Sequence, residues 1–310
     1  MIASQPRGSS WGWVLRLIGI RACRMNLRAL ARPVGLLLAA WCLLGSDDAS
    51  SAADPQPVIV MRAPLQGEGS PQIDGGARQD RADWPATLKY GVPGASFSCT
   101  ATLVGERVVV TAAHCLPGGM ASAIELAPGK TVRLTCQHHP DYEAATLSAD
   151  LALCLTGEAI QPEPAFGFER LDIDLSHLRT QSKLFLLGYG CRDVDRPDDP
   201  DRVGQLYGGS ATIDRLPFEA GGHIVTRGPH DVVICPGDSG GAAYRVSFTD
   251  GSPRIGDPRA IVGINSGYVA AERMSAIAAF TPDVAEFVRR WAAGHGVNIC
   301  GVHPEARNCR

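Results

Sequence analysis

The stretch with the clearest chemical potential is Cys235-Pro-Gly-Asp-Ser-Gly-Gly241, which places Ser239 between glycines and directly after an acid. Glycine permits backbone angles and close approaches that a side chain would block, so the pattern predicts a tight turn around Ser239. Such a turn can direct the N–H groups of Gly237 and Ser239 at one point, where they would stabilise a developing oxyanion. The stretch indicates a serine nucleophile, although an ordinary glycine-rich loop can have the same letters.

The segment Gly237–Gly241 fits two hydrolase architectures. It matches the G-x-S-x-G turn of α/β-hydrolases, in which the histidine follows the serine along the chain. In a second arrangement the order is histidine, acid, serine. The first would need His295 or His303 as its base. The second needs a histidine and an acid upstream of Ser239.

Two upstream stretches supply these partners. Thr-Ala-Ala-His-Cys places His114 at the end of an apolar run, and Ser-Ala-Asp-Leu-Ala-Leu-Cys places Asp150 at the start of another. A serine nucleophile needs a base to take its proton, and the base needs an acceptor that fixes its tautomer. Taken singly, His114 is more often a structural histidine and Asp150 the cap of a strand edge. Asp141 is a second candidate for the acid.

The first 53 residues have the order of a signal peptide. A basic segment begins at Met25, an apolar run covers 34–44, and small residues follow at 49–53. Met25 is an alternative start. Lipidation at Cys42 is a rival interpretation, but Trp41 occupies a position that requires a small residue. Residues 54–72 are rich in Pro, Gly and Gln and indicate a short propeptide or linker. We therefore expect a secreted or periplasmic protein.

Composition narrows the function further. The formal net charge is −3 over 310 residues, so the sequence lacks the excess of basic residues that is typical of nucleic-acid binding. After the expected signal peptide, no segment is long and apolar enough to span a membrane. Eight cysteines follow the leader, an even number that suits full pairing after export, although spacing alone does not fix the pairs. No Cys-x-x-Cys occurs, and the acidic stretch 193–201 lacks the spacing of a calcium loop. We expect no metal, no cofactor, no nucleic-acid partner and no membrane contact after signal removal.

The remainder of the chain must position the candidate residues. Short apolar runs such as 101–104, 107–111 and 260–264 are separated by Gly, Pro and Asp, which predicts strands of an antiparallel sandwich or barrel. One long helix is predicted from Thr281, which can cap it. An apolar face follows at Val284, Phe287, Val288 and Trp291.

The stretches around His114, Asp150 and Ser239 together resemble the trypsin/chymotrypsin family in order and approximate spacing. The resemblance covers residues 73–292 and leaves 293–310 as a C-terminal tail. It implies an all-β fold of two antiparallel six-stranded β-barrels with a C-terminal α-helix and the site in the cleft between the barrels. The implied activity is hydrolysis of protein or peptide substrates by a monomeric endopeptidase.

The resemblance also implies a role for each site residue. Ser239 attacks the substrate, His114 transfers the proton, Asp150 orients His114, and the N–H groups of Gly237 and Ser239 hold the oxyanion. Ser266 would support Asp150 by a hydrogen bond.

The implied substrate pocket has its base six residues before the serine. The residues there are Val233 and Ile234, and the wall is formed by Ser266, Gly267 and Tyr268. With no acid at the base, a substrate Lys or Arg would lose its partner, so we expect preference for a small or apolar residue. Glu272 is a candidate to enter the pocket from its other wall.

Activation and crosslinks follow from the same resemblance. Cleavage before Ile73 would free an amine that pairs with Asp238, and the sequence Pro-Gln before the cut indicates a separate processing protease. A Cys99–Cys115 bridge matches the family, and the remaining cysteines are then paired as Cys136–Cys154, Cys191–Cys235 and Cys300–Cys309.

Some positions depart from the family pattern. Asp74 replaces a usual valine, Ala242 a usual proline, and Gly267 a frequent aromatic residue. The stretch 268–280 lacks the cysteine that normally pairs with Cys235. A catalytically inactive, protease-like binding module is the alternative function, although such proteins usually lose a member of the triad.

Overall fold

A computed structural model gives the fold of the protein and describes residues 73, 75–93, 97–116, 118, 122–160, 167–191, 204–219 and 221–310. These residues all lie in one compact unit, Pro57–Arg310. The expected signal peptide at 1–53 with Cys42, the expected propeptide at 54–72, Asp74 and the acidic stretch 193–201 lie outside the described residues.

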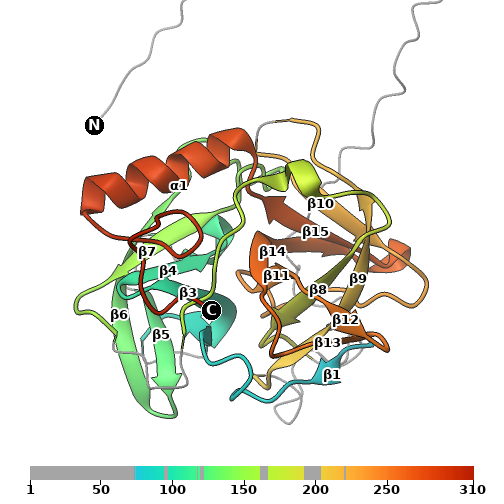
Figure 1. The fold of residues 1–310 in the computed structure, drawn as a ribbon, viewed down its shortest axis with the longest axis horizontal. Coiled ribbons are helices and arrows are strands. Elements are labelled where there is room, and N and C mark those ends of the chain that lie inside the picture. The colour runs from blue at the N-terminus through green and yellow to red at the C-terminus, as the bar shows by residue number, and fades with distance from the viewer. Residues whose placement is uncertain are drawn as a thin grey trace, which may run out of the picture. The chain divides into compact units, whose positions relative to one another are not determined.

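Six antiparallel strands form a closed barrel in the first half of the described chain (Figure 1). Its strands are Thr87–Gly91 (β2), Phe97–Gly105 (β3), Val108–Thr111 (β4), Ser122–Ala127 (β5), Lys130–His138 (β6) and Ala152–Thr156 (β7). The order around the barrel is β2-β3-β4-β7-β6-β5, and the pairing of β2 with β5 closes it.

The continuous apolar run in β4 has a structural reason. Val109 packs inside the first barrel, whereas Val108 and Val110 belong to a second cluster that includes Phe185 and Trp291. Both faces of this strand are therefore buried, and the sequence shows no alternation of polar and apolar residues.

A second set of strands closes in the same way beside the first (Figure 1). Its members are Lys183–Gly188 (β8), Tyr207–Arg215 (β9), His223–Arg227 (β10), Ala242–Arg245 (β11), Ala260–Val269 (β14) and Met274–Ala279 (β15). The order is β9-β10-β15-β14-β11-β8, and β8 pairs back onto β9. Two additions lie outside the ring: Ala77–Arg78 (β1) pairs with β9, and Phe248–Thr249 (β12) forms a hairpin with Ser252–Pro253 (β13). The expectation of two six-stranded antiparallel barrels is confirmed.

The predicted C-terminal helix is also confirmed. It spans Pro282–His295 (α1) and buries Val284, Phe287, Val288 and Trp291. Thr281 precedes it as predicted, but its side chain makes no capping bond. The Thr281 hydroxyl instead accepts a hydrogen bond from the N–H of Gly221 at 3.1 Å. A long-range contact has replaced the local one, which sequence pattern alone does not reveal.

The tail after α1 packs onto the first barrel (Figure 1). The Cys300 N–H donates to the carbonyl of Val104 at 2.8 Å, and the Cys300 carbonyl accepts from Leu171 at 2.8 Å. Cys300 is fully buried, and the Cys300–Cys309 disulfide closes the loop. The part of the predicted 293–310 tail that follows α1 therefore completes the packing of this barrel.

An ion pair lies among aromatic rings where the two barrels meet. The Arg259 guanidinium donates to Glu169 through Nε at 2.9 Å and Nη2 at 2.5 Å, and both side chains are almost fully buried. The Cζ atom of Arg259 lies 3.9 Å from the ring centre of Trp84, and Trp84 stacks on Phe185 at 5.2 Å. Arg259 also donates to the carbonyl of Asp83 at 2.9 Å, so one side chain links three separate segments.

Candidate active site

The turn that carries Ser239 requires glycine at two positions. Gly237 has φ +97 and Gly240 has φ +80, a region that side chains disfavour. A Cβ atom on Gly240 would lie 2.1 Å from the hydroxyl of Thr111 and 2.2 Å from the carbonyl of Thr100. The turn is therefore pressed against the first barrel, and a side chain at Gly240 would push it away.

Four consecutive carbonyl groups of the turn, those of residues 236–239, have donors. Thr100 donates through its hydroxyl to Gly237 at 2.7 Å and through its N–H to Ser239 at 2.8 Å. The Pro236 carbonyl accepts from the N–H of Cys191 at 3.0 Å, and the Asp238 carbonyl accepts from Gly241 at 2.9 Å.

These bonds also orient the N–H groups of Gly237 and Ser239. In a trans peptide the N–H points opposite to the carbonyl of the same unit. The N–H of Gly237 therefore points away from Cys191, and that of Ser239 points away from Gly241. Neither N–H has a hydrogen-bond partner among the described residues, so both remain available to a substrate oxygen.

Asp238 points away from this opening into the second barrel. Its carboxylate accepts from the N–H of Gly190 at 2.8 Å and of Cys235 at 3.0 Å, and also from the backbone of Ile73. Burial raises the pKa of Asp238 to about 7, against the lowering effect of these bonds. Ile73 is fully buried. A Cβ atom on Gly190 would lie 2.5 Å from the Asp238 carboxyl carbon, so the carboxyl group occupies the space that this glycine leaves.

His114 and Asp150 meet because their strands are neighbours. His114 lies on a short 3-10 helix, Ala113–Cys115 (η1), just after β4, and Asp150 lies just before β7. β4 and β7 are paired, with Thr111 opposite Ala152. Residues 36 positions apart in sequence are thereby brought to the same end of the first barrel.

Asp150 binds His114 at two points. Its Oδ2 lies 2.7 Å from the His114 Nδ1, and its Oδ1 accepts from the His114 backbone N–H at 2.9 Å. The Ser266 hydroxyl donates to Oδ2 at 2.5 Å, and Asp150 itself is fully buried. A carboxylate in this position favours the proton on Nδ1 and leaves Nε2 of His114 free to act as a base.

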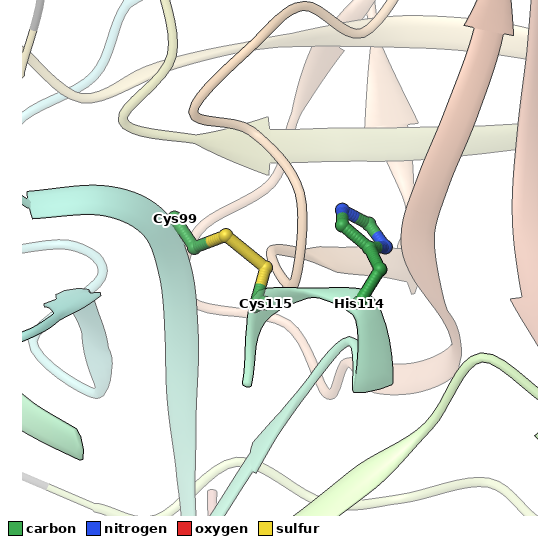
Figure 2. A group of neighbouring side chains, drawn as sticks. All are labelled: Cys99, His114 and Cys115. Carbon is green, nitrogen blue, oxygen red and sulfur yellow. A yellow bond between two sulfur atoms is a disulfide. The ribbon is translucent and has the colours of Figure 1, made fainter. Parts of the chain in front are cut away.

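A disulfide fixes the helix that carries His114. Figure 2 shows the Cys99–Cys115 bridge beside the imidazole, with His114 and Cys115 on the same short helix. The two sulfur atoms and a ring nitrogen lie within 4.8 Å of one another, a separation that would suit a metal ion. The sulfurs are bonded to each other, however, and thiolates are the species that bind metals. The group is therefore a structural crosslink.

The part of the chain that the structure describes contains four disulfides, and they join the pairs predicted above: Cys99–Cys115, Cys136–Cys154, Cys191–Cys235 and Cys300–Cys309. The Cys191–Cys235 bridge links the Ser239 turn to the segment at the end of β8, which contains the sequence Gly-Tyr-Gly at residues 188–190. It explains why 268–280 needs no cysteine.

The predicted pocket residues lie behind the Ser239 turn. Val233 and Ile234 are buried, Ser266 and Gly267 are buried on β14, and Tyr268 is partly buried farther along the same strand. Glu272 does not enter the pocket. It is exposed and forms an ion pair with Arg227 at 2.5 Å, because the short turn between β14 and β15 places it at the surface.

Three site residues were not predicted from sequence. Thr100 holds the Ser239 turn, as described above. The amide of Asn265 donates to the carbonyls of Leu187 at 3.1 Å and Asp238 at 3.3 Å. The Ser275 hydroxyl accepts from the N–H of Ile234 at 3.1 Å. Each of the three side chains contacts a segment that is distant in sequence. The only indication of such a role in the sequence was the position of Asn265 directly before Ser266.

The two barrels, the His114–Asp150 pair and the Ser239 turn define the class of protein: a trypsin-like fold. A family model described as Trypsin matches residues 73–288, which is more than half of the chain. The protein belongs to the trypsin family.

The chain also resembles a solved structure, that of neuropsin, a serine protease expressed in the limbic system of mouse brain. The TM-score is 0.55 at 17% sequence identity, and the match covers 70% of this chain and 99% of the neuropsin chain. At that identity the likeness supports the shared fold. No curated protein matches the sequence. Within the described residues, no helix is long and apolar enough to cross a membrane.

Proposed function

We propose that the protein is a secreted or periplasmic serine endopeptidase that cleaves peptide bonds through an acyl-enzyme on Ser239. The observation that carries this proposal is the double contact of buried Asp150 with His114, because it leaves the His114 Nε2 as the free base. The leader at 1–53 and the four disulfides support export.

The proposed reaction begins with attack of the Ser239 hydroxyl oxygen on the substrate carbonyl carbon. His114 takes the hydroxyl proton, and Asp150 stabilises the imidazolium that forms. The N–H groups of Gly237 and Ser239 receive the oxyanion. His114 then gives its proton to the leaving amine, and a water molecule hydrolyses the ester in a second, equivalent sequence. No metal or cofactor takes part in this proposal.

The proposed substrates have a small or apolar residue before the scissile bond. Val233 and Ile234 offer no charge, and Asp231 and Glu272 each have other partners. Asp231 accepts from the N–H of Thr212 at 2.7 Å, and Glu272 pairs with Arg227. A substrate Arg or Lys would therefore be buried without a counter-charge, which is costly.

The proposed activation step is cleavage between residues 72 and 73 by another protease. In the intact chain, Asp238 receives only neutral N–H donors, including Ile73. A new ammonium group on Ile73 would supply the missing positive charge. The active form would work as a monomer and need no membrane contact.

The alternative α/β-hydrolase interpretation is wrong, because the fold is all-β. His295 and His303 lie in or after α1, where their Nδ1 atoms bond to the Trp291 carbonyl and the Ile299 N–H.

An inactive binding module remains the alternative within the family. The deciding experiment is labelling with a peptidyl organophosphonate, followed by mass spectrometry of the tryptic peptides. We expect labelling of Ser239 in the wild type and in Ser252→Ala, an exposed-serine control, and none in Ser239→Ala. An unlabelled wild type would favour the binding module.

A further inference from the structure

The loop that carries Asp150 has an unusual backbone. Leu147 has φ 56 and Ala149 has φ 49, so two residues with side chains adopt a left-handed conformation within the four residues 147–150. Such conformations persist only where the surrounding structure determines them. The position of Asp150 therefore depends on what holds this loop.

One support comes from the segment before β10. The Gly221 carbonyl accepts from the N–H of Ala149 at 2.8 Å, and the Gly221 N–H is itself held by the Thr281 hydroxyl. A Cβ atom on Gly221 would lie 2.8 Å from both the Ala149 nitrogen and the Ser148 hydroxyl. The two segments are thus in direct contact.

The second support is His223, the first residue of β10. Its ring forms a hydrogen bond with the backbone of Leu147, the other left-handed residue. Its Nε2 atom is buried and has no hydrogen-bond partner among the described residues. A proton on Nε2 would therefore have no acceptor there.

The charged groups that act on the His223 ring are Asp150, from the loop before β7, and Glu219, from the segment before β10. Tyr142, which packs on Leu147, stays neutral because burial and the Asp150 charge raise its pKa to about 12. Burial is the largest effect on His223 and lowers its pKa below the ordinary value of 6.5. His223 is therefore uncharged at neutral pH.

We infer that His223 is a positioning residue for the catalytic acid: its uncharged ring holds the Leu147 turn, so that Asp150 stays in contact with His114. The inference rests on the proposed function. It adds a second histidine whose protonation lowers activity. A cation beside Asp150 would compete for the carboxylate that stabilises the His114 imidazolium, in addition to the direct loss of the His114 base. The acid limb of the kcat/KM profile should accordingly involve two protons.

Two substitutions separate these effects. His223→Gln keeps an N–H donor that can reach Leu147 but does not titrate, whereas His223→Leu removes the donor. We expect His223→Leu to lower kcat by about tenfold with little change in KM, because misplacement of a catalytic group slows the chemical step. His223→Gln should restore kcat to within about threefold of the wild type at pH 8 and reduce the acid limb to one proton. The exposed His230→Leu is the control and should change neither quantity.

The rate of labelling by the organophosphonate distinguishes this inference from the proposed function. A wild type that does not react overturns both. A wild type that reacts, with His223→Leu equal to it in labelling rate and in pH profile, overturns the role of His223 alone. If His223→Leu fails to fold, the decision rests on His223→Gln, in which a retained two-proton acid limb would contradict the inference.

Discussion

Thr100, on strand β3 of the first barrel, holds Gly237 of the second barrel: its hydroxyl donates to the Gly237 carbonyl oxygen at 2.7 Å. The Thr100 hydroxyl oxygen in turn accepts from the N–H of Tyr189 at 2.9 Å. One buried hydroxyl therefore joins three segments around the proposed oxyanion site, and the alignment of the two barrels is coupled to the geometry of the turn.

Thr100→Val should remove this coupling without changing the volume of the side chain much. The Tyr189 N–H and the Gly237 carbonyl would each lose a partner, and the peptide between the two proposed oxyanion donors, the N–H groups of Gly237 and Ser239, would lose a support. We expect kcat to fall by about 10²-fold, comparable to the loss of one oxyanion donor, with a smaller change in KM. Thr100→Ser keeps the hydroxyl and should retain most of the activity. Thr249→Val, at an exposed position, should have no effect. Wild-type kcat in Thr100→Val would contradict this role.

Asp150→Asn tests the choice of acid. The amide would offer an N–H to His114 and favour the wrong imidazole tautomer, so kcat should drop by about 10⁴-fold while the fold persists. Asp141 is the other acid considered from sequence, and it is exposed, with its backbone N–H donating to His139 at 3.1 Å. Asp141→Asn should therefore be fully active. The reverse pattern in a peptidase assay would show that the acid has been misassigned.

The three catalytic candidates could be predicted from sequence because each lies in a short motif whose letters reflect local needs. Position 240 is glycine because the Thr111 hydroxyl leaves no room for a side chain. Positions 188 and 190 are glycine because the Asp238 carboxyl group occupies the space that their side chains would need. Export and an even cysteine count predicted that the disulfides exist. The family resemblance supplied Cys99–Cys115, and the other three pairs were assigned from the cysteines that remained. These signals can be read in a single sequence because the residue types within each short motif carry them, even where the contacts that explain them are distant.

Thr100, His223 and Arg259 could not be predicted in the same way. Their partners lie far away in sequence, and a threonine, a histidine or an arginine in or next to a strand has many ordinary explanations. Thr281 illustrates the limit: its position before a helix correctly predicted the helix start, yet its hydroxyl serves Gly221. The sequence pattern predicted where elements and short motifs lie, whereas the contacts between distant segments could be found only in the structure.

Asp238 should make the uncleaved chain less stable as the pH rises. Its pKa is about 7 in the folded protein and 3.8 in a model compound. Below pH 3.8 both states are protonated and there is no penalty. Between pH 3.8 and about 7 only the unfolded state ionises, so the free energy of unfolding falls. Above this range the loss is constant, at about 4 kcal/mol.

Urea unfolding at several pH values measures this effect. Asp238→Asn in the uncleaved chain should lack this part of the pH dependence, because the amide does not titrate. Cleavage before Ile73 should also remove it, since an ammonium group would pair with the carboxylate. If cleaved and uncleaved proteins lose stability equally between pH 4 and 7, the Ile73 amine does not reach Asp238.

Arg259→Met should destabilise the protein by about 3–5 kcal/mol, because it leaves the buried Glu169 charge without a partner. The double variant Arg259→Met with Glu169→Leu removes both charges and should recover much of the loss. Replacing the exposed Arg254 by Met is the control, since its pair with Asp257 at 3.4 Å lies at the surface. Thermal or urea unfolding gives the comparison. Equal stability of the two single variants would mean that the buried pair contributes nothing beyond a surface pair.

The proposed wall of the substrate pocket leads to a prediction about specificity. Tyr268 lies directly opposite Ser275 in the β14–β15 pair, so their side chains share one face of the sheet. The Ser275 hydroxyl receives the N–H of Ile234, and the Tyr268 side chain packs on the cluster that contains Ile234. In the proposed pocket the tyrosine ring would narrow the space above Val233 and Ile234, so we expect a small residue of the substrate to be favoured over a large one.

We expect peptide p-nitroanilides with Ala or Val before the scissile bond to be cleaved with a kcat/KM at least about tenfold above the Arg analogue, since burial of an unpaired charge costs more than 1.4 kcal/mol. Tyr268→Gly should open the pocket and raise kcat/KM for Phe and Leu relative to Ala. Tyr207→Gly, which alters a tyrosine of β9 in the same cluster, is the matched control and should leave this ratio unchanged. Preferred cleavage after Arg by the wild type would show that a carboxylate outside the described pocket reaches the substrate. An unchanged Phe-to-Ala ratio in Tyr268→Gly would show that the tyrosine does not limit the size of the substrate residue.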